Sequence, residues 1–182
     1  MQHLLYIPVI TVCILSTISP ANARRRAKER PRARSWLVAS LDGRTVYDQK
    51  NADKVRSIAS LSKIMATLVV VESGLKLSGK TKLIPHDWVV AKGGCRTGLK
   101  RNKYYTNLDL LHAAILGSDN RAIPALGRAV GYNVDTLVRA MNRRAKKMGL
   151  KHTHFVEPTG ISHENVSTAK EVLMMLRAAA RN

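Results

Sequence analysis

Two residues at the start of an apolar segment have the types and the spacing for nucleophilic chemistry. Ser60 and Lys63 stand three positions apart, which places them on the same face of a helix. A serine hydroxyl is a weak nucleophile at neutral pH, and a nearby amine activates it where apolar surroundings lower the pKa of that amine. The pattern therefore indicates a serine nucleophile with a lysine base. A helix-capping serine beside a solvated lysine is the alternative that so short a pattern leaves open.

A second polar cluster follows later in the chain. Ser118 and Asn120, in the run Ser-Asp-Asn, lie between two predicted helices, where a hydroxyl and a carboxamide can both face a cleft. Serine-x-x-lysine followed by serine-aspartate-asparagine is typical of penicillin-binding proteins and class A β-lactamases. The order and spacing of both clusters favour the catalytic interpretation of Ser60 and Lys63.

Longer stretches around these residues resemble one family. The sequence is similar to the D-alanyl-D-alanine carboxypeptidase/endopeptidase family of low-molecular-mass penicillin-binding proteins, and most of all to its endopeptidase type. The stretches that carry the resemblance are residues 57–65, 116–122, 153–162 and 164–169. The resemblance implies an α+β fold of the β-lactamase/penicillin-binding-protein-like transpeptidase kind, with a helical cluster and an N-terminal β-hairpin.

The resemblance also implies a role for each of four side chains. Ser60 is the expected acylated nucleophile, and Lys63 the expected general base. Ser118 is expected to relay a proton to the leaving amine, and Asn120 to bind the peptide backbone of the substrate. The implied substrates are the D-alanyl bonds of peptidoglycan stem peptides and cross-links, with β-lactams as covalent inhibitors and with no cofactor or metal.

One motif of the family has no counterpart after Asn120. In the family, a Lys-Thr-Gly strand binds the substrate carboxylate and adds a backbone N–H to the oxyanion hole. Residues 96–98 (Arg-Thr-Gly) precede Ser118, and residues 158–160 (Pro-Thr-Gly) lack the cation. We therefore expect the chain to end before this motif, as a fragment, an early stop or a degenerate paralogue, with the C-terminal strands of the sheet missing. Slow turnover follows, because losing one oxyanion donor costs about a hundred- to a thousand-fold in rate.

Hydrophobic patterning predicts the elements that must position these residues. Two short β-rich runs flank Asp42-Gly43, a dipeptide suited to a tight turn, and predict a β-hairpin. Residues 60–73 are apolar on nearly every side, which predicts a buried central helix. A strand and turn are predicted near Pro85, and a loop at 93–98. The hairpin strands are expected at 36–39 and 45–47, and further helices at 106–117, 122–130, 134–148 and 172–180.

Length and charge limit the class of protein. The chain has 182 residues, 45% of them hydrophobic, which suits one soluble domain, placed here at 35–182. Lys and Arg number 31 against 12 Asp and Glu, so the formal net charge of +19 predicts an anionic partner. Trp88, Tyr104 and Tyr105 among basic residues would suit nucleic acid. The expected export argues against nucleic acid and favours carboxylate-rich cell-wall peptides.

The first residues of the chain resemble an export signal. Residues 6–18 form an apolar run too short to span a bilayer, and Ala21 and Ala23 supply the small residues of a cleavage site. We expect a signal peptide at 1–23 and a periplasmic or secreted protein, with an uncleaved anchor as the alternative. Residues 24–34 hold seven basic residues and one acidic residue. They are expected to form a flexible arm that can contact an anionic membrane surface.

Two further groups carry weaker alternatives. A metal site is the alternative for five clustered side chains, but their spacing matches no standard ligand pattern: His152, His154, His163, Glu157 and Glu164. Cys95 is the one cysteine left after removal of the signal peptide, so no internal disulfide is predicted, and its thiol is interpreted as incidental. The alternative function for the whole chain is a non-catalytic, basic protein that binds peptidoglycan.

Overall fold

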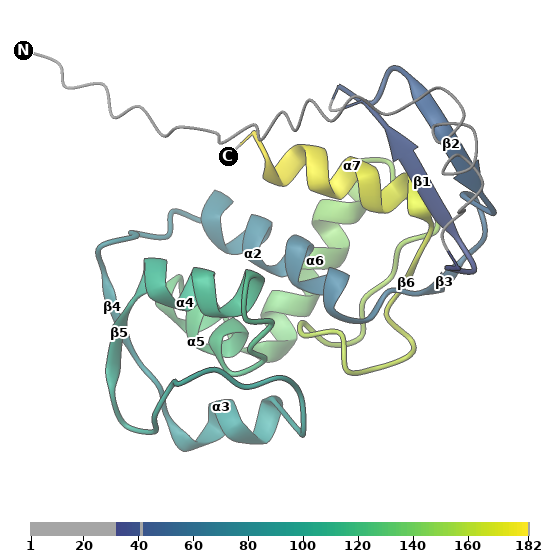
Figure 1. Cartoon of the computed structure of the whole chain (residues 1–182). Coiled ribbons are helices and arrows are strands. Elements are labelled where there is room, and N and C mark those ends of the chain that lie inside the picture. The colour runs from purple at the N-terminus through teal and green to yellow at the C-terminus, as the bar shows by residue number, and fades with distance from the viewer. Residues whose placement is uncertain (1–31, 41, 182) are drawn as a thin grey trace, which may run out of the picture. The chain divides into compact units, whose positions relative to one another are not determined.

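The structure, a computed structural model, describes residues 32–40 and 42–181. The predicted signal peptide and most of the predicted basic arm lie outside these residues. The described residues from Arg34 onward belong to one compact unit. Figure 1 shows this unit as a cluster of helices with short pairs of strands.

The predicted β-hairpin is confirmed. Its strands, β1 (Trp36–Ala39) and β2 (Val46–Lys50), pair antiparallel. Their connection is longer than the predicted two-residue turn, since the Ser40 N–H donates to the Thr45 carbonyl at 2.8 Å. Gly43 reverses the chain inside this loop with a φ of +69°, which glycine adopts without a steric penalty. Among the described residues, neither strand has a further partner strand.

Four helices form a cluster that periodicity and capping residues predict well. They are α4 (Asn107–Ile115), α5 (Ala122–Ala129), α6 (Val134–Lys147) and α7 (Ala169–Ala179). The Thr106 hydroxyl accepts the backbone N–H of Asp109 at 3.1 Å and so begins α4 where the sequence indicates. Thr168 caps α7 in the same way. Across residues 32–40 and 42–181, no helix combines the length and apolar character that a membrane-spanning segment needs.

The predicted central helix is present but begins later than expected. Ser60 lies in a 3₁₀ turn, η1 (Ala59–Leu61), and α2 (Ser62–Glu72) follows directly. Helix α2 packs against α4, α5, α6 and α7, which explains why its sequence is apolar on nearly every side (Figure 1). Its buried residues fill the centre of the core: Ser62, Lys63, Met65, Ala66, Thr67, Leu68, Val69 and Val70. Ser60 therefore lies directly before the N-terminus of a buried helix and not within the helix.

A short helix, α3 (Pro85–Val90), forms where a proline indicated a turn. The turn prediction was wrong because proline is also favoured in the first turn of a helix. The Asp87 carboxylate accepts the backbone N–H of Ile84 at 2.8 Å and closes this end of α3. On either side of α3 in the sequence, β4 (Lys80–Lys82) and β5 (Tyr104–Thr106) pair antiparallel.

Two very short strands join distant parts of the chain beside Ser60. Strand β3 (Arg56–Ser57) pairs antiparallel with β6 (Val166–Ser167). The backbone N–H of Ile58 extends the contact by donating to the Asn165 carbonyl at 3.0 Å. Strands of two residues carry no periodicity, so the sequence did not indicate them. Their pairing holds the segment before Ser60 against the segment around residue 165.

Candidate active site

Three of the four predicted site residues meet at one hydroxyl. Lys63 Nζ donates to Ser60 Oγ at 3.2 Å, and the Ser118 hydroxyl donates to the same atom at 3.0 Å. The residues come from α2, from η1 and from the loop after α4. All three face a hollow of about 490 Å³, whose other lining residues are Ile58, Ala59, Leu61, Ile64, Ala114, Ile115 and Leu176. The structure therefore brings Ser60, Lys63 and Ser118 together, as the sequence predicts.

Two residues with a left-handed backbone conformation lie at this contact. Ala59, which precedes Ser60, has a φ of +45°, and Ser118 has a φ of +51°. Residues other than glycine rarely adopt this left-handed region, at a cost of about 1–3 kcal/mol each, and such strain gathers at functional sites. The backbone N–H of Asp119 donates to the Ala113 carbonyl at 2.8 Å and helps to hold the strained turn at Ser118.

Lys63 is buried, with only 2% of its surface exposed. Its ammonium also donates to the Thr159 carbonyl at 2.7 Å. Burial lowers the pKa of Lys63 below its ordinary value, because the apolar surroundings disfavour the charged amine. The nearby carboxylates of Glu157 and Asp119 offset part of this shift in the pKa. A lysine with a lowered pKa can accept the proton of an adjacent hydroxyl, as general base catalysis requires.

The loop that supplies the Thr159 carbonyl is organised by one carboxylate. Glu157 accepts the backbone N–H of Thr159 at 2.7 Å and that of Gly160 at 2.6 Å. Asn165, fully buried, donates from Nδ2 to Glu157 at 2.9 Å and to the Ser62 hydroxyl at 2.9 Å. These contacts fix the loop against the start of α2. Sequence analysis missed them, and the available signal was the run Glu-Pro-Thr-Gly, in which a carboxylate precedes a turn.

Gly160 allows this loop to lie directly against the backbone of the predicted nucleophile. Its φ is +87°, and a Cβ at this position would lie 1.9 Å from the Ala59 carbonyl oxygen and 2.8 Å from the Ser60 nitrogen. Both the conformation and the close approach require glycine here. The loop at 157–160 and the turn that carries Ser60 therefore form one packed unit.

The residue after Ser118 anchors its loop through a buried ion pair. Arg121 Nε donates to Asp119 at 2.9 Å, and the backbone N–H and hydroxyl of Thr97 both donate to the same carboxylate at 2.8 Å. Both members of the pair are buried. Burial acts to raise the pKa of Asp119, but the hydrogen bonds from Arg121 and Thr97 outweigh it and hold this pKa below its ordinary value. No pattern in the sequence indicated this role of Arg121.

Asn120, the fourth predicted site residue, does not line the hollow at Ser60. Only 4% of its surface is exposed, and Nδ2 lies 3.5 Å from the Ala91 carbonyl. A Cβ on Gly94 would lie 1.8 Å from the same Nδ2, so the loop at 91–94 covers the carboxamide. Substrate binding by Asn120 stays a prediction, and it requires this loop to move aside.

One of the candidate metal ligands of the sequence, Glu157, has other partners. Glu157 holds the loop described above through the backbone N–H groups of Thr159 and Gly160. Over the described ranges, no group of three His, Cys, Asp or Glu side chains is arranged to hold a metal ion. Cys95 is exposed in its loop.

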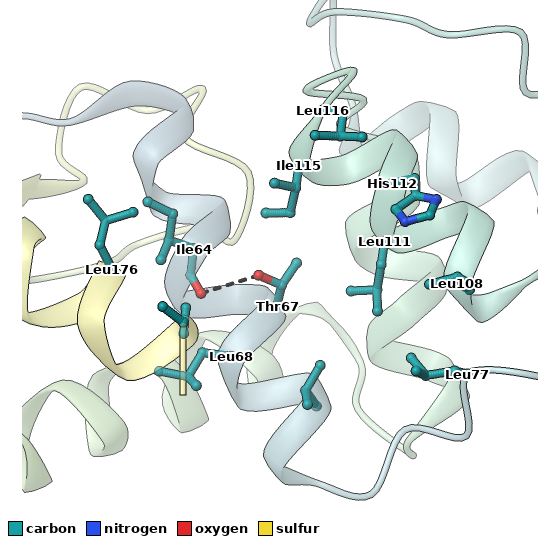
Figure 2. A pocket seen from close by; sticks show the side chains of 13 residues that line it. Ile64, Thr67, Leu68, Leu77, Leu108, Leu111, His112, Ile115, Leu116 and Leu176 are labelled. Atoms are coloured by element: carbon teal, nitrogen blue, oxygen red, sulfur yellow. Dashed lines mark hydrogen bonds between the residues drawn. The ribbon is translucent and has the colours of Figure 1, made fainter. Parts of the chain in front are cut away.

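An apolar groove opens beside the hollow. Figure 2 shows it between α2, α4 and α7, with a volume of about 530 Å³ and a lining that includes Leu68, Leu108 and Leu111. Three residues line both spaces, so the groove is continuous with the hollow at Ser60: Ile64, Ile115 and Leu176.

The fold is shared with solved structures of DD-transpeptidases and D-alanyl-D-alanine carboxypeptidases. A mutant of the Streptomyces K15 DD-transpeptidase matches 85% of this chain with a TM-score of 0.77 and 30% identity, over 63% of its own length. A D-alanyl-D-alanine carboxypeptidase from Mycobacterium tuberculosis H37Rv matches the same share with a TM-score of 0.74 and 28% identity, over 58% of its own length. The predicted α+β fold of this class is confirmed.

The chain belongs to the D-alanyl-D-alanine carboxypeptidase family, peptidase S11, whose family model matches residues 22–182. The D-alanyl-D-alanine endopeptidase of Escherichia coli K12 is 34% identical over 145 residues, covering 80% of this chain and 46% of that protein. The endopeptidase of Pseudomonas aeruginosa PAO1 is 29% identical over 175 residues, covering 96% and 56%. The chain spans about half the length of the curated relatives it matches. The family resemblance of the sequence is confirmed.

Proposed function

We propose that this chain is a serine-type D-alanyl-D-alanine carboxypeptidase/endopeptidase, which acts on peptidoglycan peptides through an acyl-enzyme on Ser60. The observation that carries the proposal is the convergence of Lys63 Nζ and Ser118 Oγ on Ser60 Oγ, at 3.2 and 3.0 Å. Membership of the family supplies the class of substrate, since the relatives are named for the D-alanyl-D-alanine bond.

The first chemical step is the transfer of the Ser60 proton to the neutral amine of Lys63. Ser60 Oγ then forms a bond to the carbonyl carbon of the D-alanyl peptide bond, and the positive end of α2 favours the developing oxyanion. Ser118, whose hydroxyl is hydrogen-bonded to Ser60 Oγ, relays the proton to the leaving amine as the carbon–nitrogen bond breaks. A water molecule then hydrolyses the ester, which returns the proton to Ser60 and releases the acid.

We also propose where this activity takes place. An export signal at residues 1–23 directs the protein to the periplasm or outside the cell, where peptidoglycan lies. The basic residues at 24–34 then add electrostatic contact with anionic surfaces, including the membrane. Sequence composition supports both statements. Detection of the protein in the cytoplasm alone, with residues 1–23 still attached, would contradict them.

The test is covalent labelling of the purified full chain with a labelled penicillin. A mass increase of one penicillin on the peptide that contains Ser60, absent in Ser60→Ala, supports the proposal. Thr45→Ala, on the surface of the hairpin, is a control that keeps the adduct. A folded chain, shown by circular dichroism, that takes no label at high protein concentration contradicts it.

A second function has its own supporting observation. The formal net charge of the chain is +19, which favours an anionic polymer as its partner. A basic chain of this kind could bind peptidoglycan without cleaving it. This function predicts sedimentation with peptidoglycan that is sensitive to salt and unchanged in Ser60→Ala, together with the absence of any penicillin adduct.

A further inference from the structure

The positive charge of the domain is concentrated in one segment. Residues 76–106 contain eight basic residues and one acidic residue, whereas the rest of 35–182 contains sixteen basic and ten acidic. All eight basic side chains are exposed, and none forms an ion pair with another described residue. We name this set the cationic face: Lys76, Lys80, Lys82, Lys92, Arg96, Lys100, Arg101 and Lys103. The one carboxylate, Asp87, is buried and paired with Arg128, so it does not neutralise the face.

The backbone gathers these side chains on one part of the surface. Figure 1 shows β4, β5 and α3 together at one end of the helical cluster. Lys80 and Lys82 are two positions apart on β4, so they point to the same side of the strand. Lys82 stands opposite Tyr104 in the register, with Nζ 5.9 Å from the centre of that ring. The Arg101 guanidinium lies 5.1 Å from the centre of the Trp88 ring.

Hydrogen bonds connect part of the cationic face to the loop that carries Ser118. Thr97 lies in the loop that carries Arg96 and Lys100. Its backbone N–H and its hydroxyl both donate hydrogen bonds to the Asp119 carboxylate. Arg121 donates to the Leu99 carbonyl at 3.0 Å in the same loop. Asp119 directly follows Ser118, whose hydroxyl reaches Ser60. A polymer held by the part of the face at residues 96–101 is therefore held beside the loop that carries Ser118.

We propose that the cationic face binds carboxylate groups of the peptidoglycan strand whose D-alanyl bond enters the hollow at Ser60. This inference rests on the proposed function and names a second contact for the same substrate. Six of the eight cations are lysines. A lysine ammonium binds a carboxylate without the fixed planar geometry that arginine favours. Such a surface suits a polymer whose carboxylates arrive at varied spacings. Electrostatic capture raises the local concentration of substrate and depends on salt.

Nucleic acid is the other class of polyanion that a basic surface can bind, and the aromatic residues decide against it. Single-stranded nucleic acid binds by stacking its bases on exposed aromatic rings. The Trp88 ring is only half-exposed, and the guanidinium groups of Arg101 and Arg121 already lie 5.1 and 5.0 Å from its centre. Tyr104 is left as the one ring of the face that is open to a base. A positively charged surface with few exposed aromatic rings favours a polycarboxylate over a nucleic acid as its partner.

The test compares two charge reversals of equal size in the full chain. The first, Lys100→Glu/Arg101→Glu/Lys103→Glu, changes the cationic face. The matched control, Arg143→Glu/Lys146→Glu/Lys147→Glu, changes exposed residues of α6. Both proteins and the wild type are sedimented with purified peptidoglycan over a series of salt concentrations, and their folding is checked by circular dichroism. Lys80→Glu/Lys82→Glu is a second variant of the face, in case the first fails to fold.

We expect about tenfold weaker retention on peptidoglycan for the variant of the face, and less than about twofold for the control. An equal loss in both would show that only total charge matters and would overturn the inference, as would full retention of the face variant. Release of the wild type by single-stranded DNA at lower concentration than by poly-L-glutamate would also overturn it, in favour of nucleic acid. Labelling of wild-type Ser60 with penicillin is measured separately, so a failure of the proposed function is recognised independently of retention.

Discussion

The carbonyl oxygen of Thr159 accepts a hydrogen bond from Lys63 Nζ at 2.7 Å, although 96 positions separate the two residues. A neutral amine has two N–H donors and one lone pair, so this bond leaves the lone pair free for the proton of Ser60. Glu157 fixes the orientation of the Thr159 peptide. A loop from the last third of the chain thus positions the proposed base at the beginning of α2.

The first prediction concerns pH. Burial lowers the pKa of Lys63 below its ordinary value of 10.5, so the neutral amine is present at lower pH than in a solvent-exposed lysine. The rate of penicillin acylation should rise with pH and level off above the lowered pKa, with its midpoint below 10.5. Lys63→Arg, which stays charged, should lose acylation at every pH tested. Rates measured by stopped labelling across the neutral and alkaline range check this, and a flat profile would contradict it.

The second prediction concerns Gly160, whose Cα faces the Ala59 carbonyl. Gly160→Ala should lower the free energy of unfolding by about 1–3 kcal/mol and reduce the acylation rate of Ser60, because the new Cβ displaces the turn that carries the nucleophile. Gly131→Ala is the matched control, since its φ of +83° imposes a similar backbone cost while no atom lies within 4 Å of the new Cβ. Urea unfolding and labelling rates measure both effects. Equal losses of acylation in the two variants would show that close packing against Ala59 is unimportant.

The third prediction concerns the buried ion pair of Asp119 and Arg121. Asp119→Asn leaves the buried guanidinium without its counter-charge and should lower the free energy of unfolding by about 3–5 kcal/mol. Asp53→Asn removes an exposed ion pair with Lys170 and should change the free energy of unfolding by less than about 1 kcal/mol. Because the pKa of Asp119 is lowered on folding, its stabilisation is present above its ordinary value of 3.8 and is lost as pH falls through the lowered pKa. Urea titrations at acidic and neutral pH should therefore show a smaller acid loss in Asp119→Asn than in the wild type.

Local patterns in the sequence predicted most of the helices and part of the site. Thr106 and Thr168 mark helix starts because capping depends on residues three positions away, which a sequence displays directly. Ser60 and Lys63 were expected together for the same reason, since one helical turn separates them. The start of α2 was placed too early because a 3₁₀ turn and an α-helix share the same apolar spacing over three residues.

Contacts across the fold could not be predicted in the same way. The Thr159 carbonyl, the Glu157 carboxylate and the Asn165 amide reach the site only through tertiary packing, which no periodicity reports. The sequence also did not indicate that the loop at Gly94 buries the Asn120 side chain, because this burial depends on how closely the loop approaches Asn120 in the fold. The meeting of Ser118 with Ser60 was expected from family resemblance and not from spacing.

The last prediction concerns the apolar groove between α2, α4 and α7 (Figure 2). Leu116 is 80% exposed and Leu108 is 42% exposed, and both line this groove. The folded chain should bind the apolar dye ANS there, and Leu108→Gln/Leu116→Gln should lower the dye fluorescence by roughly half, because it removes apolar area from the groove. Val55→Gln/Val89→Gln, at exposed valines outside the groove, is the matched control and should leave the signal unchanged. Surface substitutions of this kind change stability by only about 0.5 kcal/mol, so a fall in dye binding does not report unfolding. An equal fall in both variants would mean that the dye binds a general partly unfolded state and not this groove.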